Sequence, residues 1–423
     1  MLDIHYLREN PEQVIEKLKV KNFDASKIVN RILDIDKKRR ETQKNHDATL
    51  AESKSLSKEI GKLFKDARFD EANQLKEKTS QLKEKSKELS AELEELKNEQ
   101  QNLLIELPNV PHENVKPGTT EDDNEIIEQE AKDAIFKGKG APHWELAEKY
   151  DVIDFNTGSK ISGAGFPIYK RKLARLQRAL INYFLDLARA EGYEEVQPPL
   201  LVNEDSGFGT GQLPDKEGQM YELKNNPLFL IPTAEVPVTN MYRDMILQEK
   251  DFPIKNVAYS SCFRREAGSY GKDVRGLNRL HQFDKVEIVQ IQHPDRSYDT
   301  LTEMIEYVKK LLRNLELPFR VARLCGGDTS FAAAVTYDLE VYAKGQQKWL
   351  EVSSVSNFET YQSLRMKTRF KNKQGKMVAP HTLNGSALAL PRIIAALMEN
   401  NQSPEGIKLP EAILPYTTFD YIN

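Results

Sequence analysis

Apolar residues in the first quarter of the chain recur at the spacing of a coiled coil. Between residues 26 and 107 there is no proline and only one glycine, Gly61. Five leucines stand seven residues apart, and a second register of the same period accompanies them, so the two form the a and d positions of one heptad repeat. The first register is Leu75, Leu82, Leu89, Leu96 and Leu103, and the second is Ala72, Thr79, Ser86, Leu93, Gln100 and Leu107. The pattern predicts a long helix.

A weaker apolar stripe precedes this repeat and predicts another long helix. Its positions are Ile28, Ile32, Ile35, Leu56, Ile60 and Leu63, and it is interrupted by Arg39, Thr42, His46 and Thr49. Two helices of roughly 35 to 40 residues would each be about 55 Å long. Because the polar segment 65–68 suits a tight turn, we predict an antiparallel hairpin that projects from the body. Heptads do not fix helix direction, so a parallel coiled coil between two copies stays open as the alternative.

Charge along the predicted hairpin is mixed, but basic side chains gather near its tip. Residues 36–65 hold nine Lys or Arg against five Asp or Glu, whereas residues 66–107 hold seven against eleven. A solvated coiled-coil face explains most of this pattern. The basic cluster at the tip consists of Lys58, Lys62, Lys65, Arg68, Lys76 and Lys78. Phosphate contacts to duplex RNA need only a few such positions, so these six residues are candidates for RNA binding.

A segment rich in proline ends the second predicted helix. Residues 108–118 contain three prolines and end in Gly118, which is typical of a linker. We therefore predict an N-terminal domain over residues 1–107 that contains the hairpin (26–107), a linker over 108–130, and a second domain over 131–423.

The second domain alternates short β-rich runs with helical ones. A helix is predicted at 171–191 and a strand at 286–291. Because no βαβ repeat with a glycine-rich crossover occurs, the predicted fold class is α+β, with a mixed and mainly antiparallel sheet.

Composition limits the class of protein. The net charge of the 423 residues is only -4, so the chain has no global basic signal for nucleic acid and any RNA contact must be local. Two cysteines, Cys262 and Cys325, are too few for a disulfide framework, and no residues show zinc-ligand spacing. The first residues include Asp3 where targeting peptides carry basic residues, and no apolar run approaches membrane-spanning length. We expect a cytoplasmic protein with no membrane span.

The segment 262–290 gathers the residue types that bind a nucleotide. It begins with Phe263-Arg264-Arg265-Glu266 and later contains His281-Gln282-Phe283, so arginines, a carboxylate and an aromatic ring fall in one hairpin-like stretch. The chain has no GxxxxGK[ST] loop, so side-chain charge must hold any phosphate, and the planar arginine fork does this best. The segment resembles motif 2 of the class II aminoacyl-tRNA synthetases and is most similar to that of the bacterial-type seryl-tRNA synthetases.

Further stretches carry the same resemblance, in family order, along the chain after the linker. Residues 173–199 resemble motif 1, a helix and a strand closed by proline, which forms the dimer interface in the family. Residues 209–214 and 233–235 are similar to the family's substrate-pocket loops. Residues 350–357 match its metal and ATP strand, and residues 384–392 match motif 3.

The resemblance implies how ATP would be bound. Joining a carboxylate to a phosphate requires fixed positive charge, so Arg264 would grip the α-phosphate and Arg392 the γ-phosphate. Adenine would lie on Phe283, with Glu266 near its exocyclic amine. The implied ATP-binding residues are Arg264, Arg265, Glu266, Leu280, Phe283, Glu351, Val352, Ser353, Ser354 and Arg392.

Mg²⁺ would complete the phosphate clamp. The resemblance places it on Glu351 and Ser354, together with phosphate oxygens and water, which suits a hard cation. One departure concerns Pro391, which precedes Arg392 where many family members carry glycine. Proline can begin a helix, so it is compatible with presentation of Arg392.

The resemblance also implies how serine would be selected. A pocket built to bond the serine hydroxyl leaves its own polar groups unpaired when alanine enters, which can cost a factor of roughly 10⁴ or more. Threonine would be rejected because its methyl group lacks room. The implied serine-binding residues are Thr233, Ala234, Glu235, Arg264, Glu287 and Ser386, and the catalytic set is Arg264, Glu287 and Arg392.

Three of these residues have structural alternatives. Glu266 could belong to an ion pair, Phe283 to the core, and Glu287 to a solvated strand face. Taken as an ordered set, the motifs favour the functional interpretation.

The resemblance therefore implies a homodimeric enzyme with ATP, L-serine and tRNA as substrates and Mg²⁺ as cofactor. It would form seryl-adenylate and transfer serine to the terminal adenosine of tRNA(Ser), and of tRNA(Sec) where such a tRNA exists. The hairpin would grip the long variable arm of these tRNAs. Two alternatives stay open, an amino acid ligase for a carrier protein and a non-catalytic coiled-coil protein that binds nucleic acid. The hairpin argues against the first and the retained site residues against the second.

Overall fold

The chain folds as two units, each with its own core. The structure is a computed structural model that describes residues 1–131, 133–136, 138–216, 218–266 and 275–423. The N-terminal unit comprises residues 2–19 and 23–108, and the second unit comprises Met1, residues 20–22 and residues 109–423.

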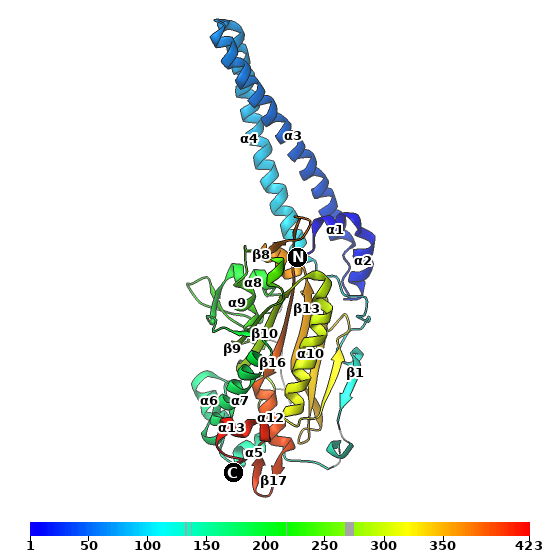
Figure 1. Cartoon of the computed structure of the whole chain (residues 1–423), viewed down its shortest axis with the longest axis vertical. Helices are drawn as coiled ribbons and strands as arrows, with labels where there is room; N and C mark the ends of the chain where they lie inside the picture. Colours follow the sequence, from blue (N-terminus) through cyan, green and yellow to red (C-terminus); the bar gives the residue numbers. More distant parts are fainter. Residues whose placement is uncertain (132, 137, 217, 267–274) are drawn as a thin grey trace. The chain divides into compact units, whose positions relative to one another are not determined.

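Two long helices form most of the N-terminal unit. Helix α3 (Ser26–Lys65) and helix α4 (Phe69–Glu106) lie side by side over their length (Figure 1). Side-chain contacts along the pair include Arg31 to Glu99 at 2.5 Å, His46 to Ser86 at 3.1 Å, and Glu52 to Lys78 at 2.8 Å. The partner's number falls along α4 as the residue number rises along α3, so the helices are antiparallel within one chain. This arrangement confirms the predicted hairpin over the parallel alternative.

The seam of the hairpin follows the predicted heptads, with one difference in burial. Five residues of the second register are buried, whereas the leucines of the first register are only half-buried. The buried five are Ala72, Thr79, Leu93, Gln100 and Leu107. Small side chains let the helices approach, and the Thr79 hydroxyl donates to the Leu75 carbonyl at 2.7 Å, so its burial leaves no unpaired donor.

A buried carboxylate fixes the base of the hairpin. Asp36 on α3 accepts hydrogen bonds from Arg8 of helix α1 (Ile4–Glu9) and from Arg40 at 2.9 Å, and from Arg39 at 3.1 Å. Burial would raise the pKa of Asp36, but the three guanidinium groups outweigh it and hold that pKa well below its usual value. Helix α2 (Pro11–Lys19) follows α1 and packs Val14 and Leu18 inward.

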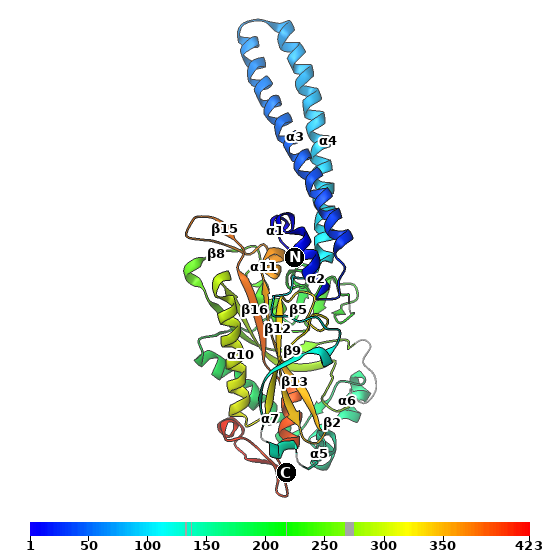
Figure 2. The ribbon, with the colours of Figure 1, turned by 90° about the vertical axis from the view of Figure 1, so that its right-hand side faces the viewer.

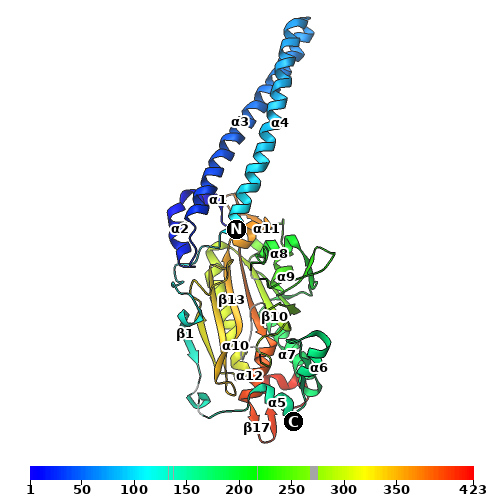
Figure 3. The ribbon, with the colours of Figure 1, turned by 180° about the vertical axis from the view of Figure 1, so that it is seen from behind.

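An eight-stranded sheet is the centre of the second unit (Figures 1 and 3). Its strands, in spatial order, are β1 (Glu125–Glu130), β11 (Phe319–Arg323), β12 (Val335–Ala343), β13 (Lys348–Glu359), β16 (His381–Ala389), β10 (Gln282–Gln292), β9 (Ile254–Phe263) and β4 (Glu194–Glu195). All neighbours are antiparallel except β4, which is parallel to β9. The α+β class and the mainly antiparallel sheet are therefore confirmed.

Three helices cover one face of this sheet. They are α7 (Arg171–Ala190), α10 (Ser297–Asn314) and α12 (Leu390–Asn400), and Figure 2 shows α10 to one side of the strands. On β10, Val286 and Ile288 join the core with these helices. Since side chains alternate along a strand, Lys285, Glu287 and Val289 point to the opposite face.

Short elements surround the sheet. The helices are α5 (His143–Lys149), α6 (Phe155–Ser162), α8 (Glu204–Thr210), α9 (Glu235–Asn240), α11 (Tyr361–Met366) and α13 (Leu414–Thr417). The small sheets are β2 (Ile153–Asp154) with β3 (Ile168–Tyr169); β5 (Leu201–Asn203), β7 (Leu228–Leu230) and β6 (Tyr221–Glu222); β8 (Ile246–Gln248), β14 (Arg369–Lys371) and β15 (Met377–Val378); and β17 (Gln402–Ser403), β18 (Gly406–Lys408) and β19 (Tyr421–Ile422). Among the residues described above, no helix combines the length and apolarity needed to cross a bilayer.

Strand β1 lies within the stretch that the sequence predicted as a linker. Its acidic side chains pair with lysines of the second unit. Glu125 accepts from Lys116 at 2.6 Å, and Glu128 accepts from Lys309 at 2.7 Å. Opposite charges thus attach a polar edge strand to the sheet.

Candidate active site

Strand register brings two of the predicted serine-binding residues together. Glu287 on β10 is the direct cross-strand partner of Ser386 on β16, and the Ser386 hydroxyl lies 3.5 Å from the Glu287 carboxylate. Glu287 is only 2% exposed, so it does not lie on a solvated strand face. The pair faces away from α7, α10 and α12, on the opposite face of the sheet.

Glu235 adds a second buried carboxylate to this face. It begins α9, which packs against β10 (Figure 3), and it is 7% exposed. Gln362 of α11 donates to one of its oxygens at 2.6 Å. Burial, followed by the charge of Glu287, raises the pKa of Glu235 to about 7. The site therefore holds a carboxyl group that titrates near neutrality.

Two polar residues that sequence reasoning missed support these carboxylates. Lys285 lies 2.5 Å from Glu287 and is itself buried. Gln362 is fixed by donating to the Thr210 carbonyl at 3.0 Å and by accepting from Thr382 at 2.7 Å. A lysine two positions before Glu287 in an apolar strand was a signal for the first residue, whereas nothing near Gln362 in the sequence pointed to the second.

The other two predicted serine-pocket residues precede α9. The Thr233 hydroxyl accepts from the Glu235 backbone N–H at 3.2 Å. Ala234 is buried in a small apolar cluster with Val238 and Val289. Both residues hold the start of α9 against the sheet.

Motif 2 supplies an arginine at the edge of this site. Arg264 follows β9, and its guanidinium lies 5.2 Å from the centre of the Phe283 ring. Phe283 packs partly against the core, as its structural alternative requires. Its ring is only half-buried, which is compatible with the predicted stacking on adenine. The Arg265 backbone N–H donates to the Gln219 carbonyl at 2.9 Å. The middle of the predicted motif 2 hairpin, residues 267–274, lies outside the described residues.

Glu266 lies in an ion pair. Arg279 donates to its carboxylate at 3.3 Å, and the Glu266 backbone has a positive φ of 47°. The ion-pair alternative for Glu266 is thus present in the structure, at the position where the sequence predicted contact with adenine.

A bulge in β13 places the two predicted metal ligands on one face. Glu351 and Ser354 are three residues apart and would face opposite sides of a regular strand. They pair with Glu340 and Asp338 of β12, which are two apart, because the register shifts between Leu339 and Glu340. Cross-strand partners share a face, so Glu351, Ser354 and Asp338 do as well.

The residues on this face suit a hard cation. One Asp338 carboxylate oxygen is buried without a hydrogen-bond partner among the described residues. Burial and the charge of Glu351 raise the pKa of Asp338 well above its usual value. Within the same described part of the chain, no three His, Cys, Asp or Glu side chains converge as a metal cage. Carboxylate and hydroxyl oxygens in this number match Mg²⁺, which takes few protein ligands and keeps phosphate and water.

Arg392 extends toward the same strand from the first turn of α12. Pro391 occupies the first turn of the helix as well, which fits its fixed φ. Arg392 donates to the Glu351 carbonyl at 2.6 Å and to its carboxylate at 3.2 Å. Although burial would raise the pKa of Glu351, the charges of Arg392 and Arg264 hold it below its usual value. Proline before the arginine therefore does not turn it away from β13.

The remaining predicted ATP residues have side chains directed into the protein. Leu280 and Val352 belong to the main core. The Ser353 hydroxyl is buried and donates to the Ser386 carbonyl at 2.6 Å. Contact between these residues and a ligand would therefore involve their backbones.

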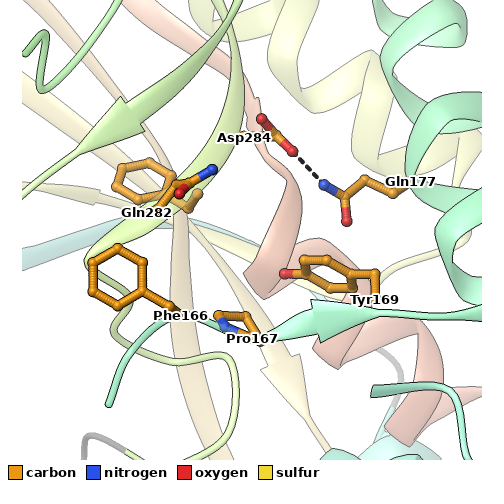
Figure 4. A pocket seen from close by; sticks show the side chains of 7 residues that line it. Phe166, Pro167, Tyr169, Gln177, Gln282 and Asp284 are labelled. Carbon is orange, nitrogen blue, oxygen red and sulfur yellow. Dashed lines mark hydrogen bonds between the residues drawn. The ribbon is translucent and has the colours of Figure 1, made fainter. Parts of the chain in front are cut away.

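A pocket lies near the start of β10, with residues of the helix-covered side around it (Figure 4). Asp284 accepts there from Gln177 of α7, and also from Ser261 at 2.8 Å and from Tyr259 at 3.0 Å. Of the predicted site residues, this pocket includes only Phe283.

The six candidate RNA-binding residues at the hairpin tip differ in their contacts. Arg68 pairs with Glu71 at 2.5 Å, Lys78 pairs with Glu52 at 2.8 Å, and Lys76 lies over the Phe64 ring. The other three, Lys58, Lys62 and Lys65, are exposed and have no ion-pair partner among the described residues.

Two protein families match the chain. Residues 1–111 match the seryl-tRNA synthetase N-terminal domain, and residues 220–401 match the tRNA synthetase class II core domain (G, H, P, S and T). A serine–tRNA ligase from Salinibacter ruber is 49% identical over 99% of this chain and 98% of its own length. A serine–tRNA ligase from Thermotoga neapolitana is 45% identical over the whole of both chains.

Solved structures agree with these matches. A seryl-tRNA synthetase from Pyrococcus horikoshii complexed with ATP has a TM-score of 0.92 at 34% identity, over 99% of each chain. A cytoplasmic serine–tRNA ligase from Naegleria fowleri in complex with AMP has a TM-score of 0.88 at 26% identity. The likeness extends over both units, so it favours neither the carrier-protein ligase nor the non-catalytic binding protein.

Proposed function

The chain belongs to the seryl-tRNA synthetase family of class II aminoacyl-tRNA synthetases and is a ligase that joins serine to tRNA, and from that premise we propose how its residues act. In the first step a serine carboxylate oxygen attacks the α-phosphorus of ATP, and pyrophosphate leaves. In the second step a ribose hydroxyl of the terminal adenosine of tRNA attacks the serine carbonyl, and AMP leaves. The observation that carries the proposal is the buried set of Glu287, Ser386 and Glu235 on the face of the sheet opposite α7, α10 and α12.

Arginines reduce the repulsion between the two anions of the first step. Arg264 contacts the serine carboxylate and the α-phosphate, and adenine stacks on Phe283 beside it. Arg392 binds the γ-phosphate and gives up its contact with Glu351 for the stronger charge of the phosphate. The position of Arg264 over the Phe283 ring, at 5.2 Å, supports a site in which base and phosphate lie together.

Two carboxylates bind the ammonium and hydroxyl of serine. Glu235 holds the ammonium with Thr233, and Glu287 with Ser386 orients the hydroxyl. Lys285 supplies an opposite charge beside the buried Glu287 carboxylate. Alanine has no hydroxyl to bond to Glu287 and Ser386 in this buried pocket, so it should be rejected strongly.

Mg²⁺ would be held by Glu351 and Ser354, with Asp338 beside them. When bound, it supplies a Lewis acid that neutralises charge on the phosphate oxygens. The unpaired Asp338 oxygen on the same face supports this assignment.

The hairpin α3–α4 binds the backbone of tRNA(Ser), and of tRNA(Sec) where that tRNA exists. Lys58, Lys62 and Lys65 are the best candidates, because the other basic residues at the tip already contact Glu52, Phe64 or Glu71. We also propose a homodimer through α7 and β4, the elements that resemble motif 1. β4 forms an edge of the large sheet, which supports this surface. A cytoplasmic location stays a prediction.

Amino-acid-dependent exchange of pyrophosphate into ATP tests this proposal. Serine should support exchange in the presence of Mg²⁺, and alanine, glycine and threonine should support at most about a thousandth of that rate. Equal exchange with alanine would remove Glu287 and Ser386 from hydroxyl recognition. No exchange with serine, from protein that still charges tRNA, would contradict the two-step route.

A further inference from the structure

The return arm of motif 2, residues 275–281, rests on the first two residues of α5. Its Leu277 backbone N–H donates to His143 Nε2 at 2.8 Å. The Arg275 guanidinium lies 4.8 Å from the centre of the Trp144 ring. Helix α5 belongs to none of the motifs that carry the family resemblance, yet it contacts the segment that leads into Phe283.

A buried carboxylate fixes the His143 ring. His143 and Glu399 of α12 are both fully buried, and His143 Nδ1 lies 2.7 Å from the Glu399 carboxylate. Because Nε2 accepts from Leu277, the ring proton is on Nδ1 and is donated to Glu399. Burial would raise the pKa of Glu399, but hydrogen bonds from His143 and Gln346 outweigh it and lower that pKa. Glu399 thus holds one tautomer of the ring.

The same carboxylate organises the turn between β12 and β13. Glu399 accepts from the backbone N–H groups of Gly345 and Gln346 at 2.9 and 3.0 Å, and from the Gln346 side chain at 2.8 Å. Gln346 in turn accepts from the Asn278 side chain at 2.8 Å. The return arm is therefore held at two successive residues, Leu277 and Asn278.

This network reaches Arg392 directly. The Asn278 carbonyl accepts from Arg392 Nε at 3.1 Å, while Arg392 Nη1 reaches Glu351. The guanidinium fork is thus directed by a backbone carbonyl whose position depends on Gln346, Glu399 and His143. None of the hydrogen bonds described for Glu235, Glu287 or Ser386 leads into this network.

The backbone at Gly276 shows how closely the return arm approaches His143. Gly276 has a φ of 71°, and a Cβ added there would lie 2.1 Å from His143 Nε2. A side chain at this position would have to displace the ring or the arm. Glycine is therefore required for the contact, independently of the hydrogen bonds.

We propose that His143 and Glu399 are positioning residues for ATP, which act through the return arm on Arg392 and Phe283. This inference rests on the proposed function, because it assumes that Arg392 and Phe283 contact ATP. A network that only stabilised the fold would affect serine and ATP alike. Positioning through Asn278 affects the nucleotide and leaves serine binding unchanged.

The test compares two full-length variants of α5 in steady-state pyrophosphate exchange. His143→Ala removes the contact with Leu277 and should raise the KM for ATP about tenfold, with the KM for serine within about twofold of the parent. Leu146→Ala is the matched control, because Leu146 is buried in the same helix and contributes only apolar packing. It should leave the ratio of the two KM values unchanged.

A second variant keeps the proposal testable if His143→Ala does not fold. Glu399→Gln preserves volume, but whichever way the amide turns, its N–H₂ group meets His143 Nδ1–H or the N–H groups of Gly345 and Gln346. We expect weaker ATP binding, measured by calorimetry without serine. An unchanged ATP affinity in folded Glu399→Gln, or equal rises in both KM values for His143→Ala, would overturn the proposal. Because calorimetry needs no turnover, an error in the proposed reaction would appear separately, as absence of exchange in the parent.

Discussion

The helical hairpin and the catalytic sheet obtain their structures in opposite ways. In the hairpin, contacts between α3 and α4 follow one seven-residue repeat, and exposed charge covers the rest. In the sheet, Glu235, Glu287, Gln362 and Ser386 come together from distant parts of the sequence. Gln362 and Glu235, which are hydrogen-bonded, are 127 residues apart. The first region is specified by local periodicity, and the second by strand register. A change in the hairpin should therefore act locally on RNA binding, whereas a change in the sheet should disturb chemistry and fold together.

The largest effect is expected where the sheet buries charge. Glu287→Gln should lower serine-dependent exchange by roughly 10³-fold, since a neutral amide cannot replace a buried carboxylate that orients the substrate. The melting temperature should also fall, because Lys285 loses its partner at 2.5 Å. Asp284→Asn on the same strand is the control, and it should affect stability without a change in the KM for serine.

Arginine geometry gives the next effect. Arg392→Lys keeps the charge but cannot reach both the Asn278 carbonyl and β13, so the KM for ATP should rise on the order of tenfold. Rates measured against ATP concentration at saturating serine report this directly. A parental KM would show that the arginine does not contact the nucleotide.

A pH dependence follows from the buried pair of carboxylates. The pKa of Glu235 is raised to about 7 by burial and by Glu287, so the acid form predominates below that pH. An uncharged Glu235 binds the serine ammonium poorly, and the KM for serine should therefore rise as pH falls below about 7, approaching tenfold per unit. In Glu235→Gln this dependence should vanish, although binding is weak at every pH. A KM for serine that is flat between pH 6 and 8 in the parent would separate Glu235 from the ammonium.

The hairpin should give the smallest effect, and one confined to RNA. Changing Lys58, Lys62 and Lys65 to Gln should weaken tRNA binding and reduce the slope of log affinity against log salt by roughly one unit per phosphate contact removed. Lys78→Gln is the matched control, since Lys78 is already paired with Glu52. Serine-dependent exchange should not change in either variant. Equal salt slopes for parent and triple variant would place the RNA elsewhere.

The two regions also differed in how far the sequence predicted them. The heptads predicted the second helix, a weaker apolar stripe predicted the first, and the polar segment 65–68 predicted the turn, because such patterns are visible residue by residue. The family motifs pointed to Glu287, Ser386 and Arg392. The register of β10 and β16 confirms that Glu287 and Ser386 lie side by side. The roles of these residues stay proposals.

Other features could not be foreseen because they depend on distant partners. Lys285 and Gln362 are polar residues in unremarkable contexts until the sheet forms. Strand β1 is acidic and pairs with β11, and the basic residues outside the strand that offset its charge are not evident from its own sequence. The bulge that brings Glu351 and Ser354 to one face has no signature in the residues of β13 themselves.

One measurement tests the central claim, that serine activation belongs to the sheet and tRNA recognition to the hairpin. Residues 35–99 are replaced by a short bridging turn, and serine-dependent pyrophosphate exchange and tRNA charging are measured on the same preparations of variant and parent. We expect exchange within about threefold of the parent and loss of most charging, because no residue assigned to serine or ATP lies in the hairpin. A variant that charges tRNA as well as the parent would contradict the assignment of tRNA recognition to the hairpin. Loss of exchange in a protein that remains folded would contradict the assignment of serine activation to the sheet alone.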